Sequence, residues 1–435
     1  MAEALQTLVL GTEFPAADRD AWLALVTKAL NGADFDRRLV SRTADGLSIQ
    51  PLYTRTDALN ENVIGFPGAA PFTRGVGSSF AEAAWDIRQL HADEDPAAAN
   101  AAILDDLSGG ATSIHLRFAA PGSFGLPYNG TALAAALDGV DLELCPVHLD
   151  AGEYITDAAG SLLALWRERG LAEPARQGGF NADPLGTLGR TGGLYHPLNR
   201  ALDIAARFAV DTQSMPGVTA LLADGTAHNA AGATEAQELA AILATLVAYL
   251  RAAERAGLSP AEALPKIAVS VAVDADQFIG IAKLRALRRL VWRVAETADA
   301  SGSVGRVRFS AVTAERMMAR RDPWVNMLRS TIACAAAAFG GAHAVTVLPF
   351  TFALGRTDAF ARRMARNIQI ILQEESGLGR TNWPKRPGRS SRPSRRVQTE
   401  RTPACPPPSA PAGGRTRSRA PAKPAPRTLR PAGYR

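Results

Sequence analysis

The feature that most constrains the fold is the segment 267–294, in which an apolar run leads directly into an amphipathic pattern. Residues 267–273 (IAVSVAV) are apolar and rich in β-branched side chains, which is typical of a strand buried on both faces. Asp274 and Asp276 follow, and apolar residues then recur every three or four positions at Phe278, Ile281, Leu284, Leu287 and Val291. A strand, an acidic turn and a helix make one β/α unit, and such folds bind their ligands at that turn.

The same alternation continues from about residue 112 to residue 376. We expect strands at 113–118, 141–149, 179–183, 207–211, 218–223, 266–274, 306–313 and 344–350, the third and fourth having the weakest patterns. The clearest helical patterns between them cover 234–256, 277–297, 323–339 and 358–375. Eight such units predict a (β/α)8 TIM barrel over residues 111–380. The alternative is an open, doubly wound sheet, which the lack of a Gly-x-Gly-x-x-Gly turn after the first strand disfavours.

Residues 1–110 are interpreted as an N-terminal extension. A helix is expected at 17–30, an irregular segment with turn residues at 51–75, and an acidic, alanine-rich helix at 96–107. This part of the chain shows no regular alternation of strand and helix patterns. We therefore expect it to lie outside the barrel.

The composition changes abruptly after Arg380. Residues 381–435 carry 14 of the chain's 48 Lys and Arg, 12 of its 28 Pro, and one acid, Glu400, which leaves the rest of the chain with a net charge of −7. Such a segment cannot bury enough apolar surface to fold, so we expect a disordered, basic tail. Because the break follows a well-formed helical pattern, we interpret the tail as the product of a shifted reading frame. A basic arm for nucleic acid is the alternative.

Composition also limits the compartment. No apolar run of about 18 residues indicates a membrane span, and the first residues lack the basic and apolar regions of a signal peptide. Cys145, Cys334 and Cys405 have no metal-binding spacing and fit a reducing compartment. The sequence therefore predicts a cytoplasmic protein without a membrane partner.

Polar residues at the expected strand ends are the candidates for chemistry. They are Arg117, His148, Asp183, Asp211, Asp224, His228, Asp274 and Thr313. Carboxylates with a histidine could act in acid–base catalysis or bind a metal, but Asp is also common as a turn and helix-cap residue. His228 is the strongest single candidate, in a turn before a helix that Thr234 is expected to cap with Gln237.

Five motifs, in order, resemble those of the methylmalonyl-CoA mutase family. They are PGAAPFTRG at 67–75, WDIRQ at 85–89, AGAT at 231–234, FIGIAKLRA at 278–286 and ARNIQIILQEES at 365–376. The resemblance runs from about residue 15 to residue 380. It implies a barrel with coenzyme A along its axis, followed by a C-terminal cobalamin domain. It also implies adenosylcobalamin-dependent radical chemistry that interconverts succinyl-CoA and (R)-methylmalonyl-CoA.

The departures from the family pattern are at polar positions. Phe80 and Ala83 stand where the catalytic chain has Tyr and Arg, and Ala227 stands at its His, with His228 one residue later. Its Arg-Thr-His-Ser-Gln-Thr-Ser-Gly reads RFSAVTAE at 308–315, its His-Thr-Asn-Ser reads VTVL at 345–348, and the cobalamin signature Asp-x-His-x-x-Gly is missing. Polar residues left as tentative substrate contacts at the barrel mouth are Arg74, Asn181, His228, Arg308 and Thr313.

This pattern resembles the small (beta) subunit of the bacterial heterodimer. The resemblance implies a non-catalytic barrel whose N-terminal extension contacts the large (alpha) subunit, with the adenosylcobalamin and the acyl-CoA on that partner. One alternative is an active acyl-CoA mutase barrel that uses a separate cobalamin-binding chain. The other is a nucleic-acid-binding protein that acts through its basic tail.

Overall fold

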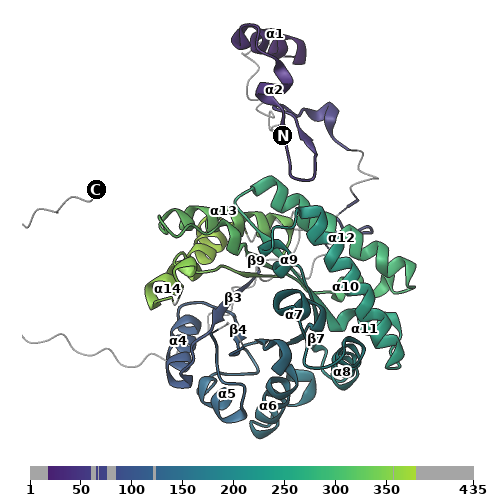
Figure 1. Cartoon of the computed structure of the whole chain (residues 1–435), viewed down its shortest axis with the longest axis vertical. Helices are drawn as coiled ribbons and strands as arrows, with labels where there is room; N and C mark the ends of the chain where they lie inside the picture. The colour runs from purple at the N-terminus through teal and green to yellow at the C-terminus, as the bar shows by residue number, and fades with distance from the viewer. Residues whose placement is uncertain are drawn as a thin grey trace, which may run out of the picture. The chain divides into compact units, whose positions relative to one another are not determined.

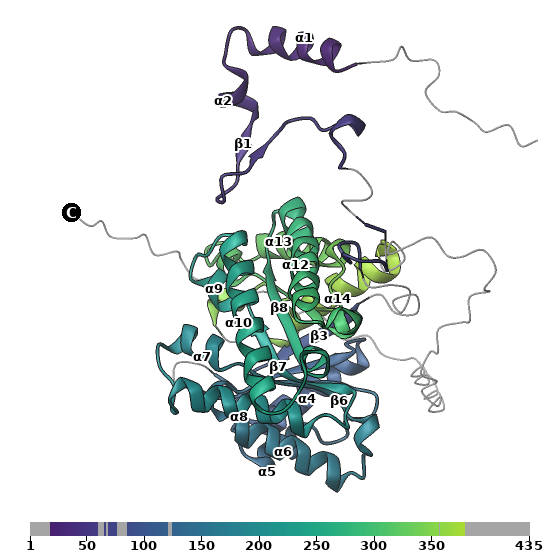
Figure 2. The same cartoon turned by 90° about the vertical axis from the view of Figure 1, so that its right-hand side faces the viewer.

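The computed structural model describes residues 18–59, 65–66, 68–75, 85–120, 124–355 and 357–378. Its centre is a closed barrel of parallel strands in the order β10-β3-β4-β5-β6-β7-β8-β9 (Figures 1 and 2). The strands are β3 (Asp86–His91), β4 (Ser113–Arg117), β5 (Val147–Asp150), β6 (Gln177–Ala182), β7 (Gly217–Asp224), β8 (Ile267–Val273), β9 (Phe309–Thr313) and β10 (Ala344–Thr346). The predicted (β/α)8 TIM barrel is confirmed.

Helices surround the barrel, as Figure 1 shows. They are α4 (Pro96–Ser108), α5 (Gly130–Ala136), α6 (Ile155–Glu168), α7 (Pro184–Thr191), α8 (Leu198–Asp211), α9 (Thr226–Ala230), α10 (Glu235–Arg255), α11 (Pro260–Ala263), α12 (Gln277–Thr297), α13 (Val325–Gly340) and α14 (Ala359–Ile370). A π-helical turn, η9 (Ile371–Glu375), continues α14. The predicted helix at 277–297 has the observed bounds, and the expected capping box of Thr234 and Gln237 starts α10.

Two sequence predictions need correction. Residues 207–211 are the last turns of α8, so the strand expected there is wrong. The missing strand is β3, inside the segment assigned to the extension, so the barrel begins at Asp86 and α4 belongs to it. The pattern of β3 misled because its helix-facing side is partly polar: Gln89 and His91 are buried there, while Asp86 and Arg88 point inward.

Hydrogen bonds join the first part of the barrel sequence to its last part and so close the barrel. The Trp85 indole donates to the side-chain oxygen of Gln369 at 3.0 Å, and the Gln373 side chain donates to the backbone oxygen of Trp85 at 2.8 Å. Beside them, the Gln89 amide donates to the backbone oxygen of Arg362. These bonds join the start of β3 to α14 and η9, so two of the five sequence motifs form the seam of the barrel.

The segment 18–59 forms elements without forming a core. It contains α1 (Arg19–Leu30), α2 (Phe35–Leu39), a hairpin of β1 (Ser41–Arg42) and β2 (Ser48–Ile49), and a short turn, η1 (Arg55–Asp57). The helix expected at 17–30 is therefore present. Not one residue of 18–59 is buried, and Leu25, Leu47 and Tyr53 are each more than half exposed.

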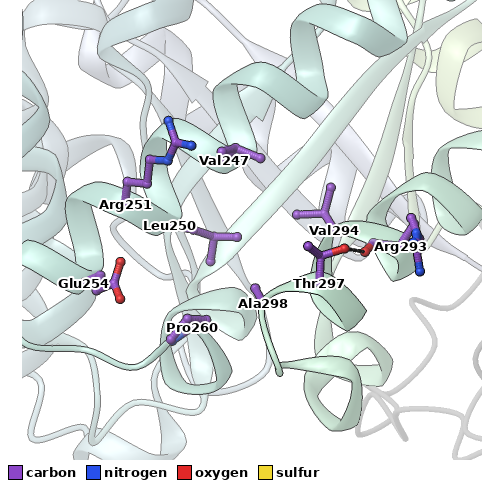
Figure 3. A pocket seen from close by; sticks show the side chains of 9 residues that line it. All are labelled: Val247, Leu250, Arg251, Glu254, Pro260, Arg293, Val294, Thr297 and Ala298. Atoms are coloured by element: carbon purple, nitrogen blue, oxygen red, sulfur yellow. Dashed lines mark hydrogen bonds between the residues drawn. The ribbon is translucent and has the colours of Figure 1, made fainter.

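In the described part of the chain, the outer surface of the helix layer has a shallow hollow of about 300 Å³. Figure 3 shows its side chains, which come from the C-terminal halves of α10 and α12 and from Pro260. In a β/α barrel, these helix ends lie at the N-terminal end of the strands, away from the mouth that binds ligands. Among the described helices, α10 has the length and composition to cross a membrane, but half of its most apolar window is buried inside the protein.

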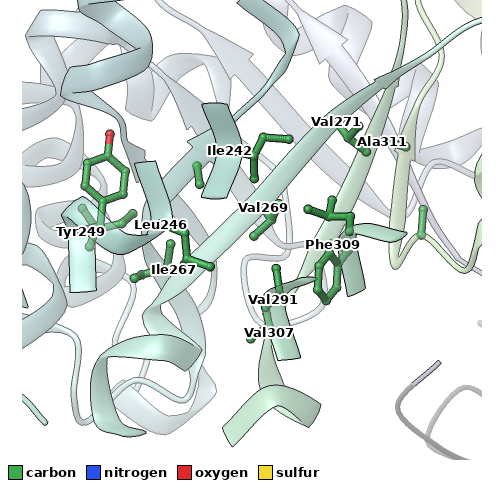
Figure 4. Close-up of a cluster of buried hydrophobic side chains, with 14 of the residues drawn as sticks. Ile242, Leu246, Tyr249, Ile267, Val269, Val271, Val291, Val307, Phe309 and Ala311 are labelled. Carbon is green, nitrogen blue, oxygen red and sulfur yellow. The ribbon is translucent and has the colours of Figure 1, made fainter. Parts of the chain in front are cut away.

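The core lies between the strands and the helices. Figure 4 shows how Val269 and Val271 of β8 meet Ile242 and Leu246 of α10, with Phe309 of β9 beside them. Every residue of β8 is buried, as its apolar run predicted. A second cluster fills the same layer outside β4, β5 and β6. Because apolar side chains point outward to the helices, the alternate positions that face the barrel axis are free to be polar.

Candidate functional site

The inside of the barrel is lined by polar side chains. On β4, the buried Ile114 and Leu116 alternate with His115 and Arg117, which are half-buried. The strand register places His115 beside His148 of β5, and Arg117 beside Asp150 one layer nearer the C-terminal end. The sequence therefore builds two polar layers inside the barrel.

The middle layer contains the two imidazoles. His115 and His148 are half-buried although strands flank both, so solvent reaches the middle of the barrel. Burial lowers the pKa of His115 to about 4 and holds the pKa of His148 well below its usual range, so both rings are neutral at pH 7. A Cβ at Gly179 would approach His148 Nδ1 to 2.7 Å, which explains why the facing position on β6 is a glycine.

At the C-terminal mouth, the charges are paired. Arg117 Nε donates to Asp150 Oδ2 at 2.9 Å, and an Nη1 of Arg190 at the end of α7 donates to Asp224 Oδ2 at 2.8 Å. Burial opposes ionisation of Asp150, but Arg117, with further cationic neighbours, still holds its pKa at about 2. Arg117 and Arg190 thus each have a carboxylate partner.

Asp183, directly after β6, is the exception. It is 5% exposed, its Oδ1 accepts a hydrogen bond from Gly186 N at 2.9 Å and a short one from the Tyr249 hydroxyl, and it caps α7. Burial and the nearby Asp224 raise the pKa of Asp183 to about 7. This carboxyl therefore keeps its proton to a higher pH than an exposed Asp does.

The structure separates the five predicted substrate contacts. Thr313 ends β9 and is buried, with its hydroxyl accepting from Leu348 N at 2.8 Å, whereas Arg308 precedes β9 and lies at the opposite end of the barrel. Asn181 has a left-handed backbone (φ 57°) at the end of β6 and donates to the Leu149 carbonyl at 3.0 Å. His228 is half-buried on α9, after β7, and Arg74 is exposed. They do not form one cluster, and their role in binding stays a prediction.

The other strand-end candidates have structural partners. Asp276 caps α12 by accepting from Ile279 N, and Asp274 accepts from Asp276 N, so both residues of the acidic turn stabilise the start of the helix. Asp211 lies at the end of α8, 3.9 Å from Arg207, and not at a strand end.

Sequence reasoning missed three members of the site: His115, Asp150 and Arg190. Asp150 could have been found, because it directly follows the strand expected at 141–149. His115 lies within an expected strand, at an alternate position whose polarity indicates the barrel interior. Arg190 had no comparable signal, since only the fold brings the end of α7 to Asp224.

Two buried ion pairs stand behind the sheet. Lys283 Nζ lies 2.9 Å from Glu238 Oε2, and this Glu also accepts from Ala272 N and from Asn229 of α9. Arg366 pairs with Asp106 at 2.5 Å between α14 and α4. Lys283 and Arg366 are thus motif residues that hold the barrel together, far from its axis.

The residues that the structure describes do not form a site that fits cobalamin. The described residues hold no group of three or more His, Cys, Asp or Glu side chains placed to bind a metal ion. None of the six histidines has an Asp two residues before it, as the cobalamin signature requires. Phe80, Ala83 and residues 379–435 lie outside the described residues, so the expected basic tail and lost C-terminal domain stay predictions.

The family model for methylmalonyl-CoA mutase matches residues 42–130 and 128–384. The chain belongs to the methylmalonyl-CoA mutase family. It is 46% identical over 381 residues to the methylmalonyl-CoA mutase small subunit of Streptomyces virginiae, covering 86% of this chain and 60% of that protein. Family membership places it in an isomerase lineage.

Two further relatives bear the same kind of name. The methylmalonyl-CoA mutase small subunit of Propionibacterium freudenreichii subsp. shermanii is 36% identical, with 87% of this chain and 59% of that protein covered. The probable small subunit of Mycobacterium tuberculosis strain H37Rv is 39% identical, with coverages of 79% and 55%. This mutase-family chain therefore spans less than two thirds of the length of these relatives, whose names imply a larger partner subunit for them.

Proposed function

We propose that this chain is the non-catalytic small subunit of an adenosylcobalamin-dependent methylmalonyl-CoA mutase, and that it supports a large catalytic subunit in the cytoplasm. The observation that carries the proposal is the charge pairing at the barrel mouth. Arg117 with Asp150 and Arg190 with Asp224 leave these guanidinium groups engaged, so neither is free to hold an acyl-CoA carboxylate or phosphate.

The family implies a cobalamin-dependent enzyme, but this chain's residues do not fit the cofactor. The cofactor therefore belongs to the partner in this proposal. When bound there, it supplies the radical that rearranges the acyl-CoA, which is chemistry no side chain provides.

The segment 18–59 supports the assignment of a partner. Short helices and a lone two-stranded hairpin are marginal in water unless they bury an apolar face. This segment buries nothing, yet it exposes Leu25, Leu47 and Tyr53. We propose that these side chains pack against the large subunit.

The test is co-expression with a large subunit from the family. We expect co-purification and mutase activity that depends on this chain, and we expect that replacing Leu25 and Tyr53 by Ser weakens co-purification at least about tenfold. A matched control is Leu144→Ser, which changes a 70% exposed leucine of the barrel. If the two chains never associate, or if activity is independent of this chain, the subunit role is wrong.

One observation favours a second candidate, an active acyl-CoA mutase barrel that uses a separate cobalamin-binding chain. Solvent reaches His115 and His148, so the axis is not closed at the middle layer. Calorimetry with coenzyme A separates the candidates. Micromolar binding that His148→Phe abolishes would support the active barrel, whereas no binding supports the non-catalytic subunit.

A further inference from the structure

The helix α7 lies at the mouth of the barrel. It contacts η3 (Gly152–Tyr154), which follows β5, and α9, which follows β7. Figures 1 and 2 show α7 and α9 together at one end of the strands. Gly192, with φ 75°, ends the helix, and Gly193 follows it, so the chain leaves α7 through residues with little steric restriction. The helix therefore lies beside the strand ends that carry Asp150 and Asp224.

Two carboxyl groups attach α7 to the barrel. Asp183 caps its first turn, and Arg190 in its last turn reaches Asp224 on β7. Asp224 also accepts hydrogen bonds from the backbone N–H and the hydroxyl of Thr226. These bonds hold in place the carboxylate that Arg190 contacts. The first turn of α7 is therefore attached through the Asp183 side chain, and its last turn through the ion pair with Asp224.

The two acids share one cation. Asp183 is 5% exposed and Asp224 is 7% exposed, and Arg190 is the guanidinium that contacts Asp224. Asp183 Oδ2 is buried and has no hydrogen-bond partner among the described residues, while its Oδ1 accepts from Tyr249 and Gly186. An ionised Asp183 would be a buried charge with one bare oxygen beside a second carboxylate, which is costly.

We propose that α7 is a pH-sensitive flap over the barrel mouth, which opens when the buried Asp183 loses its proton. Opening lets water solvate the carboxylate, whereas closure requires the neutral acid. The proposal does not depend on the mutase role, because it needs only this chain.

The direction follows from linkage. The groups that face Asp183 are Asp224 of β7, Tyr249 of α10 and Arg190 of α7, and burial with the Asp224 charge raises its pKa to about 7. In the open state, the pKa returns to about 4. The closed state then binds the proton more tightly, so opening increases about tenfold per pH unit between pH 4 and pH 7 and levels off above pH 7.

Hydrogen–deuterium exchange of residues 184–197 in the full chain tests this, from about pH 5.5 to about pH 8.5, after correction for intrinsic exchange. The wild type should show at least about a tenfold rise in opening up to pH 7, followed by a plateau. Asp183→Asn should make opening independent of pH, within about twofold. Asp211→Asn, on the exposed end of α8, is the matched control and should keep the wild-type profile.

Tyr249→Phe provides a second, directional readout. The hydroxyl donates to Asp183 and so favours its ionised form; without it the pKa should rise, and the plateau should move to higher pH. A merely structural role would change the extent of exchange without moving the plateau. A flat wild-type profile, or an Asp183→Asn profile that still rises with pH, would overturn the proposal.

Discussion

Charged side chains are buried or partly buried in two regions of this barrel, and their contacts differ between the two regions. In the helix layer, Lys283 and Glu238 are almost completely buried, and the Glu carboxylate also accepts from Ala272 N and from Asn229. At the mouth, Arg117 and Asp150 are 27% and 30% exposed and pair mainly with each other. The first pair joins α10, α12, β8 and α9, whereas the second joins two adjacent strands.

The difference separates the ion pairs that hold the fold together from those that the fold can lose. The Lys283 and Arg366 motifs hold the helices on the sheet, so a chain can keep them and keep its barrel without keeping a function. At the mouth, the Arg117–Asp150 pair can change without loss of the fold, because it is partly solvated and costs little to replace. Breaking each pair in turn tests this contrast.

The largest effect is expected from Lys283→Met. It leaves the Glu238 carboxylate buried without its cation, which should lower the free energy of unfolding by about 3 to 5 kcal/mol in urea titrations. Arg285→Met, two residues away on the exposed face of α12, is the control and should change it by less than about 0.5 kcal/mol. The double variant Lys283→Met with Glu238→Gln should recover part of the loss. If Lys283→Met and Arg285→Met lowered the free energy of unfolding equally, the distinction between the helix layer and the surface would be wrong.

The seam of the barrel should come next. Gln369→Leu removes the acceptor of the buried Trp85 indole and should cost about 1 to 3 kcal/mol, because the indole N–H is left without a partner. The Trp85 fluorescence band should shift as well, which reports the local change. Gln373→Leu, which removes one bond to a backbone oxygen, is the milder comparison. If neither variant alters the unfolding midpoint, other contacts close the barrel.

The start of α12 is expected to contribute less. Asp276→Ala removes the side chain that accepts from Ile279 N, and should cost about 1 kcal/mol by thermal or urea unfolding. Asp276→Asn is the control, because Asn also caps helices well and should recover most of that energy. A loss greater than about 3 kcal/mol would mean that Asp276 does more than cap the helix.

Sequence periodicity could predict the helix layer but not the mouth. The run 267–273 and the pattern after it are apolar at the positions that meet the core, so β8 and α12 follow from hydrophobic burial alone. The pattern of β3 gives no apolar signal because its buried side includes Gln89, which bonds to α14, and His91, which faces Asp106 of α4. The capping residues Thr234 and Asp276 could be predicted because a cap is a local interaction.

The mouth depends on contacts between residues far apart in the chain. Arg190 and Asp224 are separated by α8 and most of β7, and Asp183 and Tyr249 are 66 positions apart. A local sequence pattern therefore cannot predict either pair. Thr313 and Arg308, close in sequence, lie at opposite ends of one strand. The position of a residue at a strand end indicates that it lies near a mouth. Its partner from another part of the chain can be identified only from the closed barrel.

The smallest effect is expected from Arg117→Gln. It should lower the free energy of unfolding at pH 7 by less than about 1 kcal/mol, because the pair is partly solvated. Arg117 holds the pKa of Asp150 at about 2, below the unfolded value of about 4, so this stability is present above pH 4 and is lost as the pH falls toward 2. The difference between variant and wild type should therefore stay constant from pH 7 down to about pH 4 and shrink below that in urea titrations. In the proposed complex with a large subunit, the variant should keep mutase activity within about twofold, since loss of a group that contacts the transition state would cost far more. A tenfold loss of activity with an intact complex would mean that this mouth takes part in the reaction, and the contrast between a structural helix layer and a chemically silent mouth would fail.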